Sequence, residues 1–215
     1  SGLTSGVGAI ATGQAHTCAL TTGGGAKCWG SNGNGQLGDG TVTQRTTPVD
    51  VSETSVLTAV SLGYMHTCAL TTGGGAKCWG NNSWGQLGNE KFTNSNTPVD
   101  VSGIGGTPPP PPSTPTYRVA AGYSHTCALT SCGGVKCWGK NDFGQLGDST
   151  TGQRNTPVDV SGLTRGVTAI ATGREHTCAL TIGGGVECWG QNIYGQLGDG
   201  TTTQRTTPVN VLQSP

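Results

Sequence analysis

Residues 16–38, HTCALTTGGGAKCWGSNGNGQLG, form a unit that decides the fold because the chain contains four similar copies of it. The copies begin at His16, His66, His125 and His176, so successive units start 50, 59 and 51 residues apart. A Thr-Pro-Val segment follows each copy. One unit repeated at a nearly fixed period indicates a repeat protein, in which neighbouring units bury a shared core.

Each unit predicts four short strands. In the first unit these are Val7 to Ala11, His16 to Thr21, Ala26 to Trp29 and Pro48 to Val51, separated by turns rich in glycine. Proline has no ladder donor, so the fourth strand suits the edge of a sheet. Four antiparallel strands in about 50 residues are typical of a β-propeller blade, whereas the repeats of a β-solenoid are usually shorter. We therefore expect an all-β protein with β-propeller-type repeats, in four blades of four antiparallel strands.

Composition argues against several other classes of protein. The 215 residues include 39 glycines and carry a formal net charge of zero. Glycine at this density, without a long amphipathic run, argues against a helical protein. The lack of excess basic charge argues against nucleic acid or an anionic membrane surface as a partner. No stretch approaches 18 consecutive apolar residues, so we predict no membrane insertion.

An insert separates the second unit from the third. It contains Gly105-Gly106-Thr107 and five prolines, which we expect to form an extended polyproline II excursion. The predicted divisions of this one continuous repeat domain are residues 1–51 for repeat 1, 52–102 for repeat 2, 103–116 for the Gly/Pro-rich insert, 117–161 for repeat 3 and 162–215 for repeat 4.

The repeated motifs resemble those of a known family. Gly-x-x-His-Thr-x-Ala-Leu, Trp-Gly-x-Asn-x-x-Gly-Gln-Leu-Gly and Thr-Pro-Val together resemble the regulator-of-chromosome-condensation repeat over nearly the whole chain. The resemblance implies a propeller, usually of about seven blades, whereas this chain carries four copies of the repeat. Four such blades leave one apolar face exposed at each end, unless the ring closes with four blades, is completed elsewhere or is completed between copies.

Each unit has two cysteines ten residues apart. In a hairpin that turns at residues 22–24, facing residues have numbers that sum to 46, as Cys18 and Cys28 do. Directly opposed positions on neighbouring strands lie within disulfide range. Metal binding is the alternative, although Cys-x9-Cys is not a usual zinc-ligand spacing. The expected disulfide cysteines are Cys18, Cys28, Cys68, Cys78, Cys127, Cys137, Cys178 and Cys188.

A disulfide in every repeat predicts an oxidising compartment, so we expect an extracellular or cell-surface protein. Within the family, the chain therefore resembles bacterial, secreted, disulfide-bearing members rather than the nuclear exchange factor for a small GTPase. The ninth cysteine, Cys132, has no counterpart and replaces a turn glycine. At the tip of a hairpin it should be exposed, either as a free thiol or in an intermolecular cross-link.

Residue types that often perform chemistry recur too regularly here to form a catalytic site. Each histidine occupies the same place in its repeat, where we expect its ring nitrogens to bond to neighbouring loop carbonyls. Trp29 and its equivalents are expected to fill the space between blades, and Asp39 to cap a turn rather than to bind calcium. No close pair of acidic residues, P-loop or zinc-protease motif occurs. We therefore predict no catalytic residue, no metal and no cofactor.

Candidate binding residues lie where the copies differ. The position before Gly-Gln-Leu-Gly and the position two before the histidine both vary, and an antiparallel meander places both at the same end of each blade. Aromatic side chains on loops are common anchors for protein or carbohydrate partners, and stacking over framework loops is the alternative. The binding hypothesis names Tyr64, Trp84, Tyr123, Phe143 and Tyr194.

These observations favour a non-enzymatic extracellular repeat module that binds protein or glycan through an aromatic loop face. The alternative is a self-assembling structural subunit of an extracellular fibre or ring, joined through its exposed blade ends. A propeller resembling a guanine-nucleotide exchange factor comes third, because exchange would need a complete ring. The predicted partners are a protein, a glycan or copies of the chain, as a homo-oligomer or as part of a longer chain, with no nucleic acid.

Overall fold

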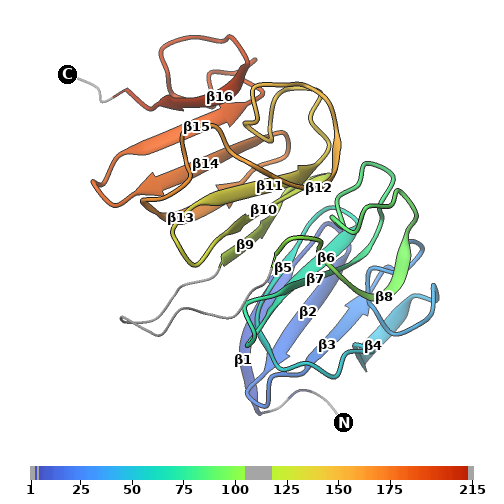
Figure 1. The fold of residues 1–215 in the computed structure, drawn as a ribbon. Coiled ribbons are helices and arrows are strands. Elements are labelled where there is room, and N and C mark those ends of the chain that lie inside the picture. Colours follow the sequence, from blue (N-terminus) through green and yellow to red (C-terminus); the bar gives the residue numbers. More distant parts are fainter. Residues whose placement is uncertain (1–2, 4, 105–117, 213–215) are drawn as a thin grey trace.

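The structure, a computed structural model, describes residues 3, 5–104 and 118–212. Within these residues it contains sixteen strands and no helix, arranged as four antiparallel sheets of four strands (Figure 1). The predicted all-β fold with four blades is confirmed. The described residues include no helix long and apolar enough to span a membrane. The predicted Gly/Pro-rich insert, residues 103–116, lies almost wholly outside the described residues.

The strands follow one another in chain order, four to a blade. Blade 1 contains β1 (Val7–Thr12), β2 (His16–Thr21), β3 (Ala26–Gly30) and β4 (Arg45–Asp50). Blade 2 contains β5 (Leu57–Leu62), β6 (His66–Thr71), β7 (Ala76–Gly80) and β8 (Ser95–Asp100). Blade 3 contains β9 (Arg118–Ala121), β10 (His125–Leu129), β11 (Val135–Gly139) and β12 (Arg154–Asp159). Blade 4 contains β13 (Val167–Thr172), β14 (His176–Thr181), β15 (Val186–Gly190) and β16 (Arg205–Asn210).

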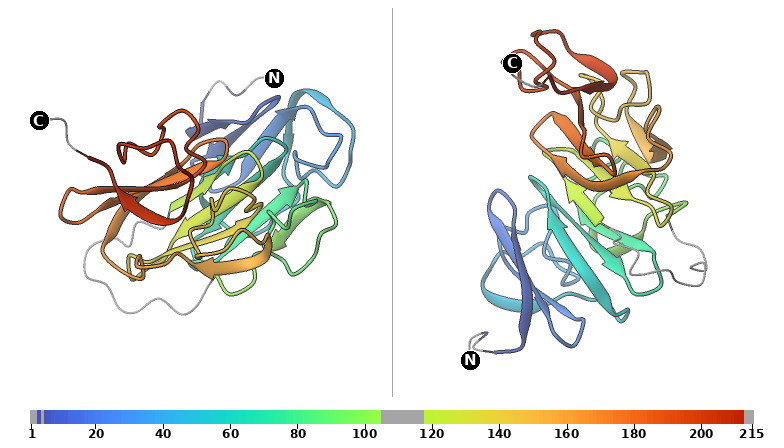
Figure 2. Two further views of the ribbon diagram at one scale, coloured as in Figure 1. Left: turned by 90° about the horizontal axis from the view of Figure 1, so that it is seen from above. Right: turned by 90° about the vertical axis from the view of Figure 1, so that its left-hand side faces the viewer.

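The four blades form an arc. Their first strands, β1, β5, β9 and β13, are neighbours from one blade to the next, while the fourth strands are the outer edges of the sheets (Figure 2). Blades 1 and 4 lie at opposite ends of this arc (Figure 1). Each inner blade is therefore covered on both faces, whereas each end blade is covered on one.

The register of the central hairpins is the one that the sequence predicted. Cys18 faces Cys28 in the pairing of β2 with β3, and the same opposition recurs in the other three blades. All four disulfides are formed, with the paired Cα atoms 4.1 Å apart. The predicted pairing is confirmed, and these thiols are not free to ligate a metal. Cys132 is exposed and belongs to none of these disulfides.

The fourth strand of each blade begins earlier than predicted. In blade 1 it spans Arg45–Asp50 rather than Pro48 to Val51, so the predicted start was wrong by three residues. A register irregularity between Cys28 and Gly30 allows the polar residues before the proline to continue the pairing as far as Gly30. These residues lack the apolar alternation by which strands are usually recognised, which explains the error. Pro48 does lie in an edge strand, as predicted.

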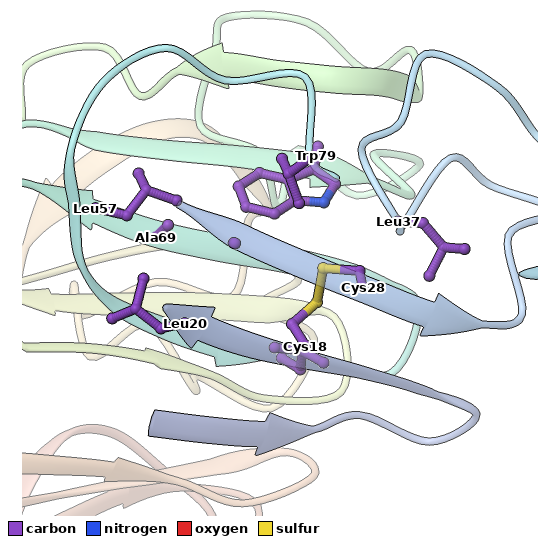
Figure 3. Close-up of a cluster of buried hydrophobic side chains, with 10 residues drawn as sticks. Cys18, Leu20, Cys28, Leu37, Leu57, Ala69 and Trp79 are labelled. Atoms are coloured by element: carbon purple, nitrogen blue, oxygen red, sulfur yellow. A yellow bond between two sulfur atoms is a disulfide. The ribbon is translucent and has the colours of Figure 1, made fainter. Parts of the chain in front are cut away.

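Neighbouring blades pack through the tryptophan of one blade and the disulfide hairpin of the blade before it. Trp79 of blade 2 is fully buried in a cluster with Cys18, Leu20 and Leu37 of blade 1 (Figure 3). The predicted role of the tryptophans is confirmed for Trp79 and, in the next two blades, for Trp138 and Trp189. Trp29 of blade 1, which no blade of the described residues precedes, is only partly buried.

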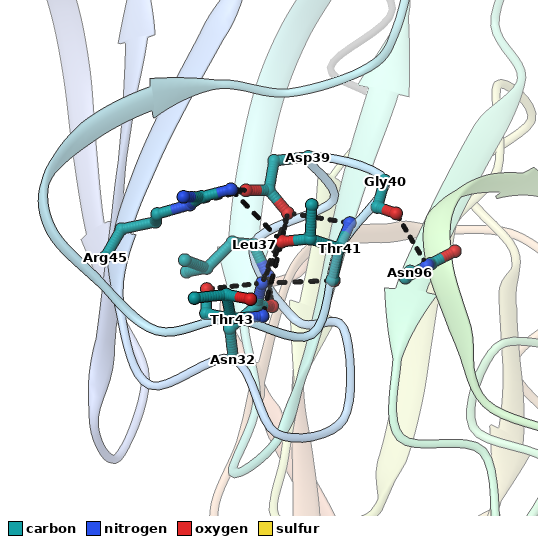
Figure 4. A network of polar contacts seen from close by, with 8 residues as sticks. All are labelled: Asn32, Leu37, Asp39, Gly40, Thr41, Thr43, Arg45 and Asn96. Atoms are coloured by element: carbon teal, nitrogen blue, oxygen red, sulfur yellow. Dashed lines mark hydrogen bonds and ion pairs between the residues drawn. The ribbon is translucent and has the colours of Figure 1, made fainter.

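An asparagine holds the long loop between the third and fourth strands. The Asn32 amide donates to the Asp39 carboxylate and to the carbonyl oxygen of Thr41 (Figure 4). Asp39 also accepts from the Thr41 amide and forms an ion pair with Arg45 at 2.8 Å, so its predicted role in capping a turn is confirmed. The same network recurs around two further pairs, Asn141 with Asp148 and Asn192 with Asp199. The variable residue before the motif is held by the glutamine of Gly-Gln-Leu-Gly, as the Trp84 amide donates to the Gln86 side chain at 2.9 Å.

Candidate functional site

The two variable loop positions lie on the same face of the arc. Tyr64 and Trp84, one from each kind of loop in blade 2, line a depression of about 180 Å³ together with Tyr123 of blade 3. Tyr64 follows β5 and Trp84 follows β7, and in a meander these two loops emerge at the same end of the sheet. The structure therefore brings three of the five predicted binding residues together.

A stacked row of side chains crosses three blades near the centre of this face. The rings of Tyr64 and Tyr123 stack with their centroids 4.0 Å apart and their planes inclined by 26°. The guanidinium of Arg174 lies 4.8 Å from the centroid of the Tyr123 ring, within range of a cation–π contact. Gln14 holds the same position in repeat 1, and all four residues line one central depression of about 300 Å³.

Farther from the centre, a lysine joins two aromatic rings. The Lys140 ammonium lies 5.4 Å from the ring centroid of Trp84 and 5.5 Å from that of Phe143. The same nitrogen is 3.1 Å from a carboxylate oxygen of the buried Glu175, whose other oxygen accepts from Gln145 at 2.6 Å. Glu175 thus holds the Lys140 ammonium in place, and the ammonium in turn holds the Trp84 and Phe143 rings in a defined arrangement.

Tyr194, the fifth predicted residue, lies apart from these stacks. It is 86% exposed and makes none of the ring contacts described above. With Phe143 and Arg174 it lines a third depression, of about 620 Å³, toward the open end of blade 4. The structure therefore groups Tyr64, Trp84, Tyr123 and Phe143 and leaves Tyr194 at the edge of the group.

Three charged residues belong to this site although they were not among the predicted ones: Lys140, Arg174 and Glu175. The signal for them was present, because they too occupy positions that vary between repeats. The residue after Trp-Gly is Ser, Asn, Lys or Gln in the four copies, and the residue before the histidine is Ala, Met, Ser or Glu. A search confined to aromatic residues misses the cations that hold the rings.

The histidines are structural, as predicted, but their predicted partners were wrong. Nε2 of His66 lies 2.9 Å from the hydroxyl of Thr126 in the next blade and bonds to this side chain instead of a loop carbonyl. The Thr126 hydroxyl in turn donates to the carbonyl oxygen of Gln86 at 3.1 Å, so it must accept from the histidine. The histidine therefore carries its proton on Nε2. Consecutive sheets face one another here, so the histidine reaches a side chain of the next blade.

Burial keeps these histidines neutral. It lowers the pKa of His16 to about 4 and the pKa values of His66 and His125 to about 3. A histidine that does not titrate near neutral pH is a poor general acid or base. Among the described residues, no three His, Cys, Asp or Glu side chains are placed to hold a metal ion.

Comparison with protein families gives a match over most of the chain. A model described as the regulator of chromosome condensation (RCC1) repeat matches residues 28–70, 78–129, 133–180 and 184–215. A second model of the same description matches residues 9–36, 57–86, 118–145 and 167–196. Each region matched by the second model contains the histidine and the central hairpin. Each region ends at the glutamine of the Gly-Gln-Leu-Gly motif.

Several larger proteins contain similar segments. The human probable E3 ubiquitin-protein ligase HERC4 is 39% identical over 100 residues, which is 46% of this chain and 10% of that protein. The ultraviolet-B receptor UVR8 of Arabidopsis thaliana is 37% identical over 98 residues, which is 45% of this chain and 22% of the receptor. The matched segment is therefore a small part of either relative.

Solved structures match over nearly the whole chain. Human WBSCR16 superposes with a TM-score of 0.82 at 27% identity, covering 96% of this chain and 53% of that one. Prp20p from Saccharomyces cerevisiae, which has been studied for its binding to Gsp1p and histones, superposes with a TM-score of 0.80 at 21% identity, covering 97% and 51%. This chain corresponds to about half of either structure.

Proposed function

The chain belongs to the regulator of chromosome condensation repeat family, as predicted, and from this premise we propose that it is a non-enzymatic module that binds another protein. The proposed binding surface, here called the loop face, consists of Tyr64, Trp84, Tyr123, Phe143, Lys140 and Arg174. The observation that carries the proposal is the contact between aromatic rings and cations at positions where the repeats differ.

The composition of the loop face suits a protein interface. Tyrosine, tryptophan and arginine are the residues most enriched among those that dominate binding energy. Side chains that are already ordered lose less conformational entropy when a partner binds. Lys140 holds Trp84 and Phe143, and the stack of Tyr64 on Tyr123 holds the centre of the face, so this surface is largely preorganised.

The arrangement of the rings favours a protein over a glycan. A sugar usually stacks on the open face of an aromatic ring, but Tyr64 and Tyr123 already stack on each other and Arg174 lies over Tyr123. Lys140 likewise lies over Trp84 and Phe143. Tyr194 is the residue of the predicted set whose ring is most open to a sugar.

The relatives assign no particular activity or partner to this chain. The similarity to HERC4 and to human HERC2 covers 10% and 2% of those ligases, so their activity is not inferred for this chain. The likeness to Prp20p, at 21% identity, supports the fold and no particular partner. Four disulfides support our further proposal of an extracellular or cell-surface location.

A capture experiment tests the loop face. Immobilised wild-type protein and the double variant Trp84→Ala, Phe143→Ala would be exposed to proteins from the medium and surface of the producing organism. Ile182→Ala is the matched control, because Ile182 is 76% exposed on a hairpin at the opposite end of its blade. Loss of two anchors that contribute about 2 kcal/mol each weakens binding by a factor of about 1,000, so partners should be lost from the double variant alone.

Two outcomes would count against this proposal. Equal capture by the wild type and a folded double variant would exclude Trp84 and Phe143 as anchors. Binding to immobilised glycans that requires Tyr194 but not Trp84 and Phe143 would favour the glycan hypothesis instead. Circular dichroism of each variant would establish that it is folded.

A further inference from the structure

The depression of about 180 Å³ between blades 2 and 3, here called the loop-face pocket, has no counterpart in the other two contacts between blades that is equally open. Blade 2 supplies Tyr64, Asn81, Trp84 and Gln86 to its lining, and blade 3 supplies Tyr123 and Ser124. Both walls of the pocket therefore belong to the inner blades of the arc.

In the contact between blades 3 and 4, a side chain of the protein itself fills the equivalent place. Glu175 precedes the histidine of blade 4, and its two carboxylate oxygens lie 3.1 Å from the Lys140 ammonium and 2.6 Å from the Gln145 side-chain nitrogen. Lys140 and Gln145 hold the repeat positions of Asn81 and Gln86. A long side chain of the following blade thus lies among residues that correspond to the lining of the pocket.

Met65 fills the equivalent place between blades 1 and 2. It precedes the histidine of blade 2, and its sulfur lies 3.3 Å from the side-chain nitrogen of Asn34, the residue equivalent to Trp84. Between blades 2 and 3 the residue before the histidine is Ser124, whose side chain is much shorter. The pocket is open because the repeat that would fill it carries a serine.

The hydroxyl of this serine is available to a ligand. Ser124 is 6% exposed and lines the pocket, and its hydroxyl forms no hydrogen bond with another described residue. The neighbouring polar groups bond to one another, because the Gln86 side chain donates to Asn81 at 2.6 Å and accepts from the Trp84 amide at 2.9 Å. Buried hydroxyls are usually hydrogen-bonded, so the Ser124 hydroxyl offers a bond to a group that enters the pocket.

The charges around the pocket favour an uncharged occupant. No charged residue lines it, and a charge that loses its water there would gain no partner. Aromatic walls often bind cations, but Lys140 already lies 5.4 Å from the Trp84 ring and Arg174 lies 4.8 Å from the Tyr123 ring, so a further cation would be repelled. An anion would find the Lys140 ammonium already paired with Glu175.

We propose that the loop-face pocket receives one uncharged side chain of the protein partner, of the length of methionine, leucine or glutamine. The proposal rests on the protein-binding role of the loop face and names the chemistry that this face recognises. The length follows from Met65 and Glu175, which fill the equivalent places in the other two contacts. The side chain would pack against Trp84 and Tyr123, and the Ser124 hydroxyl would bond to a polar atom of the partner.

Selection of peptides tests the chemistry of the occupant. A library of random peptides displayed on phage would be selected on the wild-type protein, and the enriched sequences would be synthesised. We expect them to share one methionine, leucine or glutamine. Replacing that residue of the peptide with glutamate or lysine should weaken binding by about 10- to 100-fold, measured by fluorescence polarisation.

Variants of the chain test the place of binding. Ser124→Met fills the pocket with the side chain that blade 2 carries at the equivalent position, and it should weaken peptide binding by about 10- to 100-fold. Ala15→Met is the matched control, because it adds the same side chain at the equivalent, exposed position of blade 1 and should leave binding unchanged. If Ser124→Met does not fold, as judged by circular dichroism, the substitutions in the peptide decide the test.

The outcomes separate this proposal from the function on which it rests. Peptides that require Trp84 and Phe143 but bind Ser124→Met as tightly as the wild type would overturn the pocket and leave the loop face as the binding surface. A shared acidic or basic residue in the peptides would overturn the uncharged occupant. Peptides that bind equally well to Ser124→Met and to the double variant Trp84→Ala, Phe143→Ala would count against both the pocket and the loop face.

Discussion

Replacing Thr177 with valine would remove the hydroxyl at the centre of the contact between blades 3 and 4 while nearly preserving the shape of the side chain. The hydroxyl accepts from Nε2 of His125 at 3.0 Å and donates to the Gln145 carbonyl at 3.0 Å, and the side chains of His125 and Thr177 are fully buried. In the variant, the His125 donor has no acceptor. The Gln145 carbonyl keeps the Trp189 indole as a donor.

The expected cost follows from these contacts. A buried donor left without a partner costs about 1–3 kcal/mol, and most of that cost should fall on His125. We therefore expect Thr177→Val to lower the free energy of unfolding by about 2 kcal/mol. Urea denaturation followed by tryptophan fluorescence, with the disulfides intact, measures this change.

Thr17→Val is the matched control because Thr17 holds the same position in blade 1 but is partly exposed. Its effect should stay within about 0.5 kcal/mol. Equal losses in the two variants would refute the reasoning, since they would show that the histidine bond adds nothing to the contact between the blades. A loss confined to Thr177→Val would support it.

Three further predictions concern the same framework. The free energy of unfolding should fall as the pH drops from 6.5 to about 4, because the histidines of the unfolded chain bind protons while His16, His66 and His125 of the folded chain stay neutral. Each of these histidines contributes up to about 1.4 kcal/mol per pH unit. Urea midpoints that do not change with pH would contradict this prediction. Removing one disulfide in Cys68→Ala, Cys78→Ala should lower the free energy of unfolding by about 3 kcal/mol, measured as a lower urea midpoint, and an unchanged midpoint would contradict it. Gly147→Ala should lower the free energy of unfolding by about 1–3 kcal/mol more than Gly198→Ala does, because both glycines have positive φ but only Gly147 lies against an indole. Equal losses of stability in thermal unfolding would be evidence against this packing.

The sequence predicts local pairing well because hairpin geometry is set by few residues. The glycine turn fixes the register of the central hairpin, and the register places Cys18 opposite Cys28. The fourth strand was placed less well, because its first residues are polar and their pairing passes through an irregularity. Periodicity alone does not reveal such a strand start.

Contacts between blades were less accessible to sequence reasoning. The bond of His66 to Thr126 joins residues 60 positions apart and depends on how two sheets face each other. The same is true of Lys140, whose role follows from its place between Trp84 of one blade and Phe143 of its own. Variation between repeats does identify the positions on the loop face, but it does not reveal which side chains hold one another.

The measurement that tests the central claim most directly is amide hydrogen exchange of the chain with and without its captured protein partner. Binding through the loop face predicts slower exchange in the loops at residues 63–65, 81–84, 122–124 and 140–143. The hairpins at residues 22–25 and 182–185, at the opposite end of the blades, should be unchanged. Protection confined to those hairpins, with the loops unaffected, would contradict the account.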